Sequence, residues 1–274
     1  MNLDTKTINS FGEEWHYYNH INLEDGFIEK YFNDYFAIFP WDLISKNSVG
    51  FDLGCGSGRW SRFVAPKVGT LHCIDASEKA LEIAKINCKD LDNCVFHLCS
   101  IENITSEDNY FDFGFSLGVL HHVPNTASAM DIAVKKLKKG APLLLYLYFS
   151  FDNKPVWYKL LWKVSDLFRK IISKLPFKIK LVTCKVIARF IYFPFSRLAN
   201  FFDYLKFNTN HFPLAYYKNS SLYTMENDAL DRFGTSIEHR FSKVEIENMM
   251  KIAGLSDIKF SDHPPFWVSV GYKN

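Results

Sequence analysis

The sequence predicts an α/β fold with a mainly parallel sheet. Over residues 45–150, short apolar runs alternate with segments of helical periodicity, and a similar alternation returns over 226–274. Strands that alternate with helices are typical of parallel sheets with right-handed crossovers. The composition agrees with a packed domain, because 48% of the residues are hydrophobic and 23% are charged.

The expected strands and helices of residues 45–150 follow from apolar runs and capping residues. Ser77 is expected to cap a helix that continues through Cys88, and Asn125 a helix to Lys138 that Gly140 closes. The apolar runs predict five strands, at Val49–Leu53, Thr70–Ile74, Val95–Leu98, Phe111–Leu117 and Ala141–Phe149.

The rest of the chain divides into three further parts. Residues 1–44 are predicted to form an N-terminal helical cap, because apolar residues recur at helical spacing over 24–38. Residues 151–225 interrupt the alternation and look inserted into the 45–150 core. Residues 226–274 return to the core, with a helix from Ser242 to Ala253 and strands at Leu255–Phe260 and Phe266–Tyr272. The polar stretch at 228–240, before that helix, is expected either to fold over the substrate opening, where it would meet residues 15–18 of the N-terminal cap (Trp15, His16, Tyr17 and Tyr18), or to be a solvated loop beside plain packing of the cap.

The inserted part combines basic and apolar residues. Over residues 154–207 there are 12 Lys and Arg against two Asp, and apolar residues recur at helical spacing over 156–175 and 178–193. Three interpretations stay open. The insert is a helical lid that buries its apolar face on the core, a basic amphipathic surface in peripheral contact with an anionic membrane, or a lid that closes on an anionic or lipid-linked acceptor. Nucleic acid is not favoured, because the aromatic residues fall on the apolar stripe.

The location and the metal content are predicted from what the sequence lacks. No apolar run approaches the roughly 18 residues of a membrane span, and residues 1–20 do not have the apolar segment of a signal peptide. The six cysteines show no paired CxxC spacing. We therefore expect a cytoplasmic protein with reduced thiols and no metal, either free or peripheral at the inner face of the membrane.

A glycine-rich turn carries the strongest chemical signal. Gly54, Gly56 and Gly58 follow the first expected strand, and Asp75 ends the second, 19 residues after Gly56. Glycines let a ligand approach the backbone, and an acid at about this distance binds ribose hydroxyls. The pattern predicts an adenosine-containing cofactor. A nicotinamide cofactor is disfavoured, because Arg59 and Ser61 stand where GxGxxG would require glycine.

The string Asp-Leu-Gly-Cys-Gly-Ser-Gly at residues 52–58 resembles the first motif of the class I S-adenosylmethionine (SAM)-dependent methyltransferases. Similar strings follow in order at 73–77, 110–112, 117–123 and 137–140. The His-His-Val string at 121–123 resembles the small-molecule and quinone methyltransferase branch. The resemblance implies a Rossmann-like, seven-stranded sheet whose last strand is antiparallel, with SAM as the cofactor.

The resemblance also implies roles for individual residues. The three glycines would turn against the methionine and ribose groups, with Asp52 near the methionine amino group and Asp75 on both ribose hydroxyls. Ser100 and Ile101 stand where many relatives bind the adenine amino group through an aspartate, so the adenine contact differs here. The implied cofactor residues are Asp52, Gly54, Gly56, Gly58, Asp75, Ala76 beside the adenine, Ser100, Ile101, and Leu117 and Gly118 near the reactive methyl.

His121 and His122 are the candidate catalytic residues, because they follow the fourth strand and a histidine is a suitable base near pH 7. The alternative is that they hold the loop. The expected function is SAM-dependent methyl transfer to a small or lipid-linked acceptor, such as a sugar hydroxyl of a surface glycan precursor. A quinone or lipid head group is the alternative acceptor, and a catalytically silent SAM-binding interaction protein is the alternative function.

Overall fold

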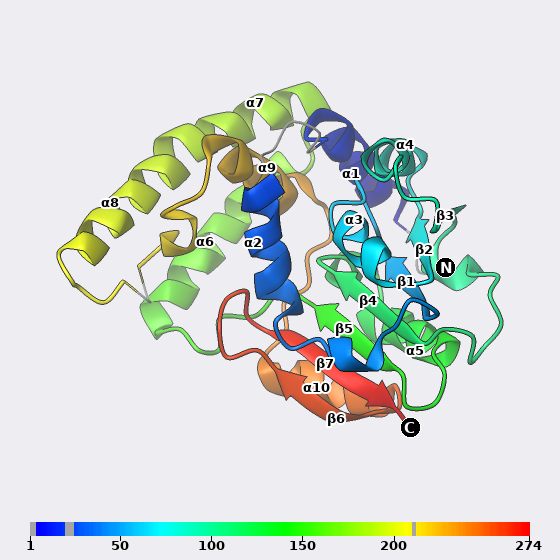
Figure 1. Cartoon of the computed structure of the whole chain (residues 1–274). Coiled ribbons are helices and arrows are strands. Elements are labelled where there is room, and N and C mark those ends of the chain that lie inside the picture. Colours follow the sequence, from blue (N-terminus) through cyan, green and yellow to red (C-terminus); the bar gives the residue numbers. More distant parts are fainter. Residues whose placement is uncertain (1–3, 20–24, 210–211) are drawn as a thin grey trace. The chain divides into compact units, whose positions relative to one another are not determined.

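The chain folds into two compact units (Figure 1). The computed structural model describes residues 4–19, 25–209 and 212–274. Unit 1 comprises residues 1–150 and 237–274, and unit 2 comprises residues 151–236. The insert expected at 151–225 lies within unit 2, which also takes in residues 226–236 that were expected in the core.

Unit 1 is built on a seven-stranded sheet in the order β3-β2-β1-β4-β5-β7-β6. The strands are β1 (Val49–Leu53), β2 (Thr70–Asp75), β3 (Cys94–Leu98), β4 (Phe113–Leu117), β5 (Pro142–Tyr146), β6 (Leu255–Phe260) and β7 (Val268–Lys273). The first five strands pair in parallel, whereas β7 runs antiparallel to both β5 and β6. The predicted seven-stranded sheet with an antiparallel last strand is confirmed.

The register places the ends of neighbouring strands at one level. Leu53 of β1 pairs with Ile74 of β2, and Asp75 of β2 pairs with Leu98 of β3. Because each pair is parallel, the loops that follow these strands leave the sheet side by side. This alignment brings the glycine-rich turn next to Asp75.

The crossover helices begin where their caps predict. The helices that alternate with the strands of unit 1 are α3 (Ser61–Val64), α4 (Glu78–Asn87), α5 (Thr126–Lys136) and α10 (Lys243–Ile252). The Ser77 hydroxyl accepts from the N–H of Ala80, and the Asn125 side chain accepts from the N–H of Ser128. Each side chain thereby satisfies an N–H group that the first turn of its helix leaves unpaired.

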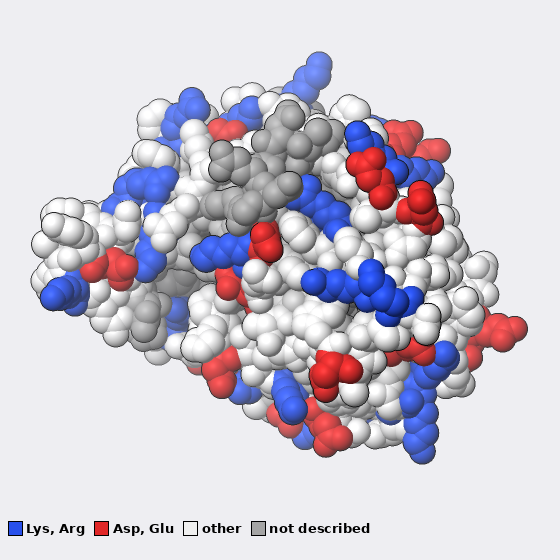
Figure 2. Space-filling model, in the orientation of Figure 1, with Lys and Arg blue, Asp and Glu red and all other residues white. Residues whose placement is uncertain are grey.

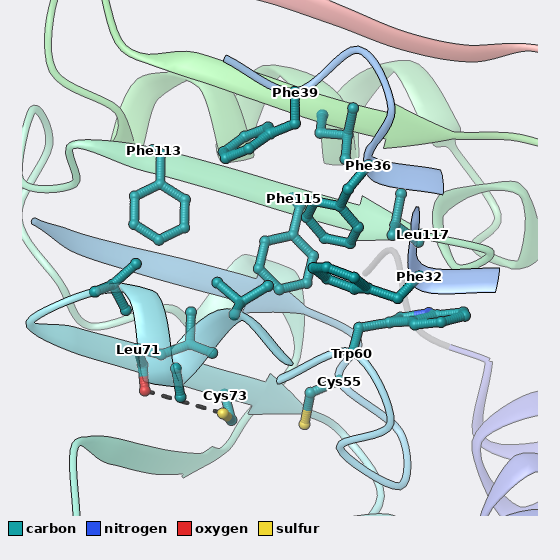
Figure 3. Close-up of a cluster of buried hydrophobic side chains, with 14 of the residues drawn as sticks. Phe32, Phe36, Phe39, Cys55, Trp60, Leu71, Cys73, Phe113, Phe115 and Leu117 are labelled. Carbon is teal, nitrogen blue, oxygen red and sulfur yellow. Dashed lines mark hydrogen bonds between the residues drawn. The ribbon is translucent and has the colours of Figure 1, made fainter. Parts of the chain in front are cut away.

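Two N-terminal helices, α1 (Thr5–Tyr17) and α2 (Asp25–Phe36), belong to unit 1. The start of the predicted cap helix at Glu24 lies outside the described residues. Phe32 and Phe36 of α2 stack at 4.4 Å between ring centroids, and Phe36 meets Phe115 of β4 edge-on at 5.3 Å. Figure 3 shows these rings with Trp60 in one buried cluster. The aromatic N-terminal segment therefore anchors α2 on the core of the sheet.

Unit 2 consists mainly of helices. They are α6 (Val156–Ile172), α7 (Phe177–Ile187), a π-helical stretch at Ala188–Tyr192, α8 (Phe193–Tyr204) and α9 (Leu222–Gly234). The second predicted helix of the insert thus continues past 193 to Tyr204. Helix α9 packs against α6, α7 and the π-helical stretch. Among the described residues, none of the helices has both the length and the apolar character needed to cross a bilayer.

Candidate functional site

The predicted site residues gather at the carboxyl ends of β1 to β4. The strand order reverses between β1 and β4, because β2 and β3 lie on one side of β1 while β4 and β5 lie on the other. Ligands of open α/β sheets bind at such a reversal, outside the carboxyl ends of the strands. The loops after these four strands carry the residues that the sequence singled out.

The glycine-rich turn has a backbone that requires glycine. Gly54, Gly56 and Gly58 all have positive φ angles, of 77°, 54° and 73°. A Cβ added at Gly54 would lie 2.4 Å from a methyl carbon of Val119, so the loops after β1 and β4 touch at this point. The N–H groups of Gly54 and Cys55 donate to the carbonyl of Ile74 at 2.8 and 3.1 Å, which ties the turn to β2.

Asp75 joins the glycine-rich turn to the loop after β2. One carboxylate oxygen accepts from the N–H of Gly56 at 2.9 Å, and the other accepts from the N–H of Ser77 at 2.8 Å. Burial raises the pKa of Asp75 above its ordinary value, while the backbone N–H donors oppose that rise. A carboxylate offers about four acceptor positions, so the two bonds leave acceptor capacity for ribose hydroxyls.

Asp52 lies beneath the turn. Its side chain is 1% exposed, and one oxygen accepts from the Ser61 hydroxyl at 2.6 Å. Desolvation by burial raises the pKa of this carboxyl to about 7. The carboxyl thus connects β1 to the start of α3 in this structure, and its expected place near the methionine amino group stays a prediction.

The loops after β3 and β4 complete the group. Ser100 precedes a short 3-10 turn at Ile101–Asn103, and the N–H of Cys99 donates to the Asp75 carbonyl at 3.0 Å. Ala76 is partly buried in the loop after β2.

Leu117 is 6% exposed at the end of β4, and Gly118 follows it with a φ of 81°. A Cβ added at Gly118 would meet no atom of the described residues within 4 Å, apart from its chain neighbours, so the backbone here borders open space.

The two histidines follow β4, and the ring of His121 stacks on that of Tyr148. His121 is fully buried, its ring lies 3.8 Å from that of Tyr148, and its nitrogens make no hydrogen bond to a described residue. Burial, followed by the positive charges of His122, Arg240 and His239, lowers the pKa of His121 well below its ordinary value. The ring is therefore neutral at pH 7.

His122 makes a different set of contacts. Its Nδ1 lies 2.6 Å from the carbonyl oxygen of Ile237, and because a carbonyl only accepts, Nδ1 carries the proton. The ring of Phe11 in α1 approaches at 4.9 Å between centroids. The structure therefore fixes the orientation of this imidazole from two sides.

Helix α1 adds a contact to the glycine-rich turn that the sequence pattern did not predict. A Cβ added at Gly56 would lie 3.0 Å from the indole nitrogen of Trp15, so this ring covers the glycine-rich turn. The Arg59 guanidinium lies 5.2 Å from the Trp15 ring centroid and 4.6 Å from that of Trp60. These contacts are cation–π geometry. The signal in the sequence was weak, since an aromatic N-terminus is equally consistent with plain core packing.

Residues 237–241 border the carboxyl ends of β4 and β5. The N–H of His239 donates to the carbonyl of His121 at 2.9 Å, and that of Phe241 donates to Tyr148 at the same distance. Arg240 and Glu238 form a 2.7 Å ion pair whose side chains are 9% and 1% exposed. This end of the polar stretch is therefore packed rather than solvated. A buried ion pair at the ends of strands is a feature that charge counting alone does not reveal.

Comparison with known proteins agrees on one family. The family model of the methyltransferase domain matches residues 44–207. The ubiquinone biosynthesis O-methyltransferase of Hydrogenovibrio crunogenus is 34% identical over 112 residues, which are 40% of this chain and 44% of that protein. The demethylmenaquinone methyltransferase of Staphylococcus saprophyticus is 30% identical over 141 residues, 48% of this chain and 59% of that protein.

The chain thus spans about half the length of these curated relatives. Among solved structures, a candidate methyltransferase of Bacillus halodurans superposes with a TM-score of 0.51 at 18% identity, covering 84% of this chain and 71% of that one. At this identity the superposition reports on the fold alone.

Proposed function

The chain belongs to the methyltransferase domain family, in the class I SAM-dependent group, and from this premise we propose that it transfers a methyl group from SAM to a small or lipid-linked acceptor. Membership confirms the resemblance drawn from residues 52–58. One observation carries the proposal: Asp75 accepts from the N–H of Gly56. This contact places a carboxylate that can bind ribose hydroxyls beside a glycine-rich turn that a ligand can approach closely.

The proposed roles follow from where the residues lie. Asp75 would accept from both ribose hydroxyls, and Gly54, Gly56 and Gly58 would face the methionine and ribose groups. Ser100, Ile101 and Ala76 would border the adenine, because their loops follow β3 and β2 beside Asp75. Asp52 would influence the methionine amino group from below the turn.

Methyl transfer from SAM requires mainly that the protein positions the acceptor. SAM supplies a methyl group on a sulfonium that is already activated, so the protein aligns the acceptor in line with it and excludes water. The open space beside Gly118, next to Leu117, supports placing the methyl and the acceptor there. A hydroxyl acceptor also requires a base, and His122 is the better candidate of the two histidines. His121 is fully buried, and its ring is stacked on Tyr148, as suits a positioning residue.

Two acceptor classes are proposed. The first is a sugar hydroxyl of a surface glycan precursor. The second is a quinone or a lipid head group, which the names of the curated relatives favour. We also propose a cytoplasmic location, with peripheral contact between residues 154–207 and the inner face of the membrane. A lipid-linked acceptor would be reached from that position.

Two experiments test the proposed function. Calorimetry with SAM, S-adenosylhomocysteine and NAD tests the cofactor, and we expect binding of the first two only. Binding of NAD without SAM would overturn the proposal. A screen of cell extract with SAM labelled in its methyl group then identifies the acceptor. SAM binding without transfer to any extract component would instead favour a catalytically silent SAM-binding protein.

A further inference from the structure

Helix α6 of unit 2 is folded with its apolar face outward. Its inward residues are polar or mixed: Arg169 is 6% exposed, donates to the carbonyl of Thr235 at 3.1 Å and pairs with Asp166. The opposite face is a continuous apolar surface with exposed fractions between 46% and 82%, made of Val156, Trp157, Leu160, Leu161, Val164, Leu167, Phe168 and Ile171.

The stretch from α7 to α8 repeats this arrangement. Its buried positions recur mostly every fourth residue and carry small or polar side chains, at Lys180, Cys184, Ala188, Tyr192, Ser196 and Ala199. Lys180 donates to the carbonyl of Gly234 at 2.7 Å and is 6% exposed. Large apolar side chains point the other way, with Val182, Phe190 and Phe201 exposed by 61%, 71% and 54%.

This pattern is the reverse of a water-soluble helix pair, in which the apolar stripe faces the core and the polar face meets water. An apolar surface of this extent marks an interaction site. Because the helices of unit 2 use their polar and small residues inward, the apolar face of α6 stays exposed among the residues that the structure describes.

The charges beside this face indicate the chemistry of the partner. At 100° per residue, Lys159, Lys163 and Lys170 lie along one edge of the apolar face of α6. Residues 154–207 carry 12 basic and two acidic residues. The visible surface over α7 and α8 is mostly uncharged, with Lys and Arg and fewer acidic residues between (Figure 2). A second copy of the chain would bring two segments of the same strong positive charge together, whereas an anionic surface neutralises them.

We propose that unit 2 docks on an anionic lipid bilayer, with α6 lying in the interface. The apolar side chains of α6 enter the boundary between head groups and acyl chains, and its flanking lysines pair with lipid phosphates. Helices that are too short and too charged to cross a membrane suit this orientation. The inference deepens the membrane contact of residues 154–207 proposed above and in that respect rests on the proposed function, and it holds whether or not the acceptor is lipid-linked.

Sedimentation with vesicles tests the docking. The full-length chain is mixed with phosphatidylcholine vesicles, with and without phosphatidylglycerol, at low and at high salt. The test variant is the double change Leu160→Ser and Leu167→Ser, at side chains 62% and 60% exposed on the apolar face. The matched control is Val244→Ser with Ile252→Ser on α10 of unit 1, at side chains 64% and 85% exposed. A charge variant, Lys163→Glu with Lys170→Glu, tests the electrostatic part separately.

The wild type is expected to sediment with anionic vesicles at low salt and to be released as salt rises. The test variant should bind about tenfold or more weakly, because each leucine loses its transfer into the apolar layer. The control pair should bind as the wild type does, and the charge variant should lose binding to anionic vesicles.

Three results would overturn the docking. They are no binding of the wild type to anionic vesicles, equal loss in the control pair, or a lipid-free dimer that the test variant dissociates. Calorimetry with SAM on the same proteins keeps the two proposals apart, because the serine variants leave the SAM site intact. Circular dichroism melts check that each variant is folded, and the charge variant still tests the docking if the serine pair is not.

Discussion

Replacement of Asp75 by asparagine separates the two tasks that this carboxylate performs. In the structure its oxygens accept from the N–H groups of Gly56 and Ser77 at 2.9 and 2.8 Å. In the proposed complex the remaining acceptor positions take the ribose hydroxyls of SAM. Asparagine keeps the shape but loses the charge and replaces one oxygen by an NH₂ group, which cannot accept. The substitution should therefore weaken SAM binding more than it weakens the fold.

The magnitude follows from the number and type of hydrogen bonds. A hydrogen bond to a charged group contributes about 1.5–3 kcal/mol, and a neutral one about 1 kcal/mol. Losing one charged bond and weakening the other removes about 3 kcal/mol, or roughly a hundredfold in Kd. The fold loses one acceptor for a backbone N–H, but the buried charge also disappears. Since burial raises the pKa of Asp75, removing the charge offsets part of the cost. We expect a net destabilisation of about 1 kcal/mol.

Calorimetric titration with SAM and a thermal melt measure the two effects. Ser77→Ala serves as the matched control, because Ser77 caps α4 by accepting from the N–H of Ala80 and is not expected to touch SAM. Loss of this cap should cost about 1 kcal/mol of stability, with SAM affinity kept. An Asp75→Asn protein that binds SAM as tightly as the wild type would refute the ribose role. Equal losses of SAM affinity in both variants would show that the effect comes from loop stability alone.

Three further substitutions test other parts of the site. Asp52→Asn removes the buried carboxyl. Because the folded pKa of Asp52 is about 7 and its ordinary value is 3.8, the wild type loses stability as pH rises from 4 through 7. In denaturant melts at pH 8 the variant should therefore be more stable than the wild type, by up to about 4 kcal/mol. His122→Asn keeps an N–H donor for the carbonyl of Ile237 but removes the imidazole base. If the acceptor is a hydroxyl, kcat should fall about a hundredfold or more, and an unchanged rate–pH profile would exclude the base role. Gly118→Ala meets open space, so it should lower methyl-transfer rate while costing only about 1–2 kcal/mol from its φ of 81°; normal turnover would place the acceptor elsewhere.

The sheet of unit 1 was predictable because its signals are local. Apolar runs with turn residues gave all seven strands to within a few residues, and Ser77, Asn125 and Ser242 marked the helix starts. Strand ends were less accurate. The run at 141–149 predicts a longer strand than β5 (Pro142–Tyr146), because apolar residues continue beyond Tyr146, where the ladders with β4 and β7 end and only an isolated bridge between Phe149 and Phe241 follows. Apolar character reports burial, whereas strand assignment requires a paired neighbour.

The cofactor end of the site was predictable for a similar reason. The turn at 54–58 and Asp75 follow adjacent parallel strands, so a spacing in the sequence becomes a contact in the fold. Trp15 and Tyr148 could not be found this way. Their places depend on packing between segments far apart in the chain, and no short-range pattern encodes which aromatic ring will cover Gly56 or stack on His121.

The insert shows what helical periodicity does not predict. The spacing over 156–175 correctly predicts an amphipathic helix, but the spacing does not determine which face of the helix is buried. In unit 2 the inward face carries Arg169 and Lys180, which bind backbone carbonyls at the end of α9 and just beyond it.

The net charge of the whole chain also hides where the charges lie. The chain as a whole has a formal charge of +2, yet residues 154–207 carry +10, which leaves −8 for the remainder. A net charge near zero for the whole chain therefore does not exclude an anionic partner. The positive charge and the exposed apolar side chains occupy the same segment, and this segment is separate in the sequence from the cofactor residues.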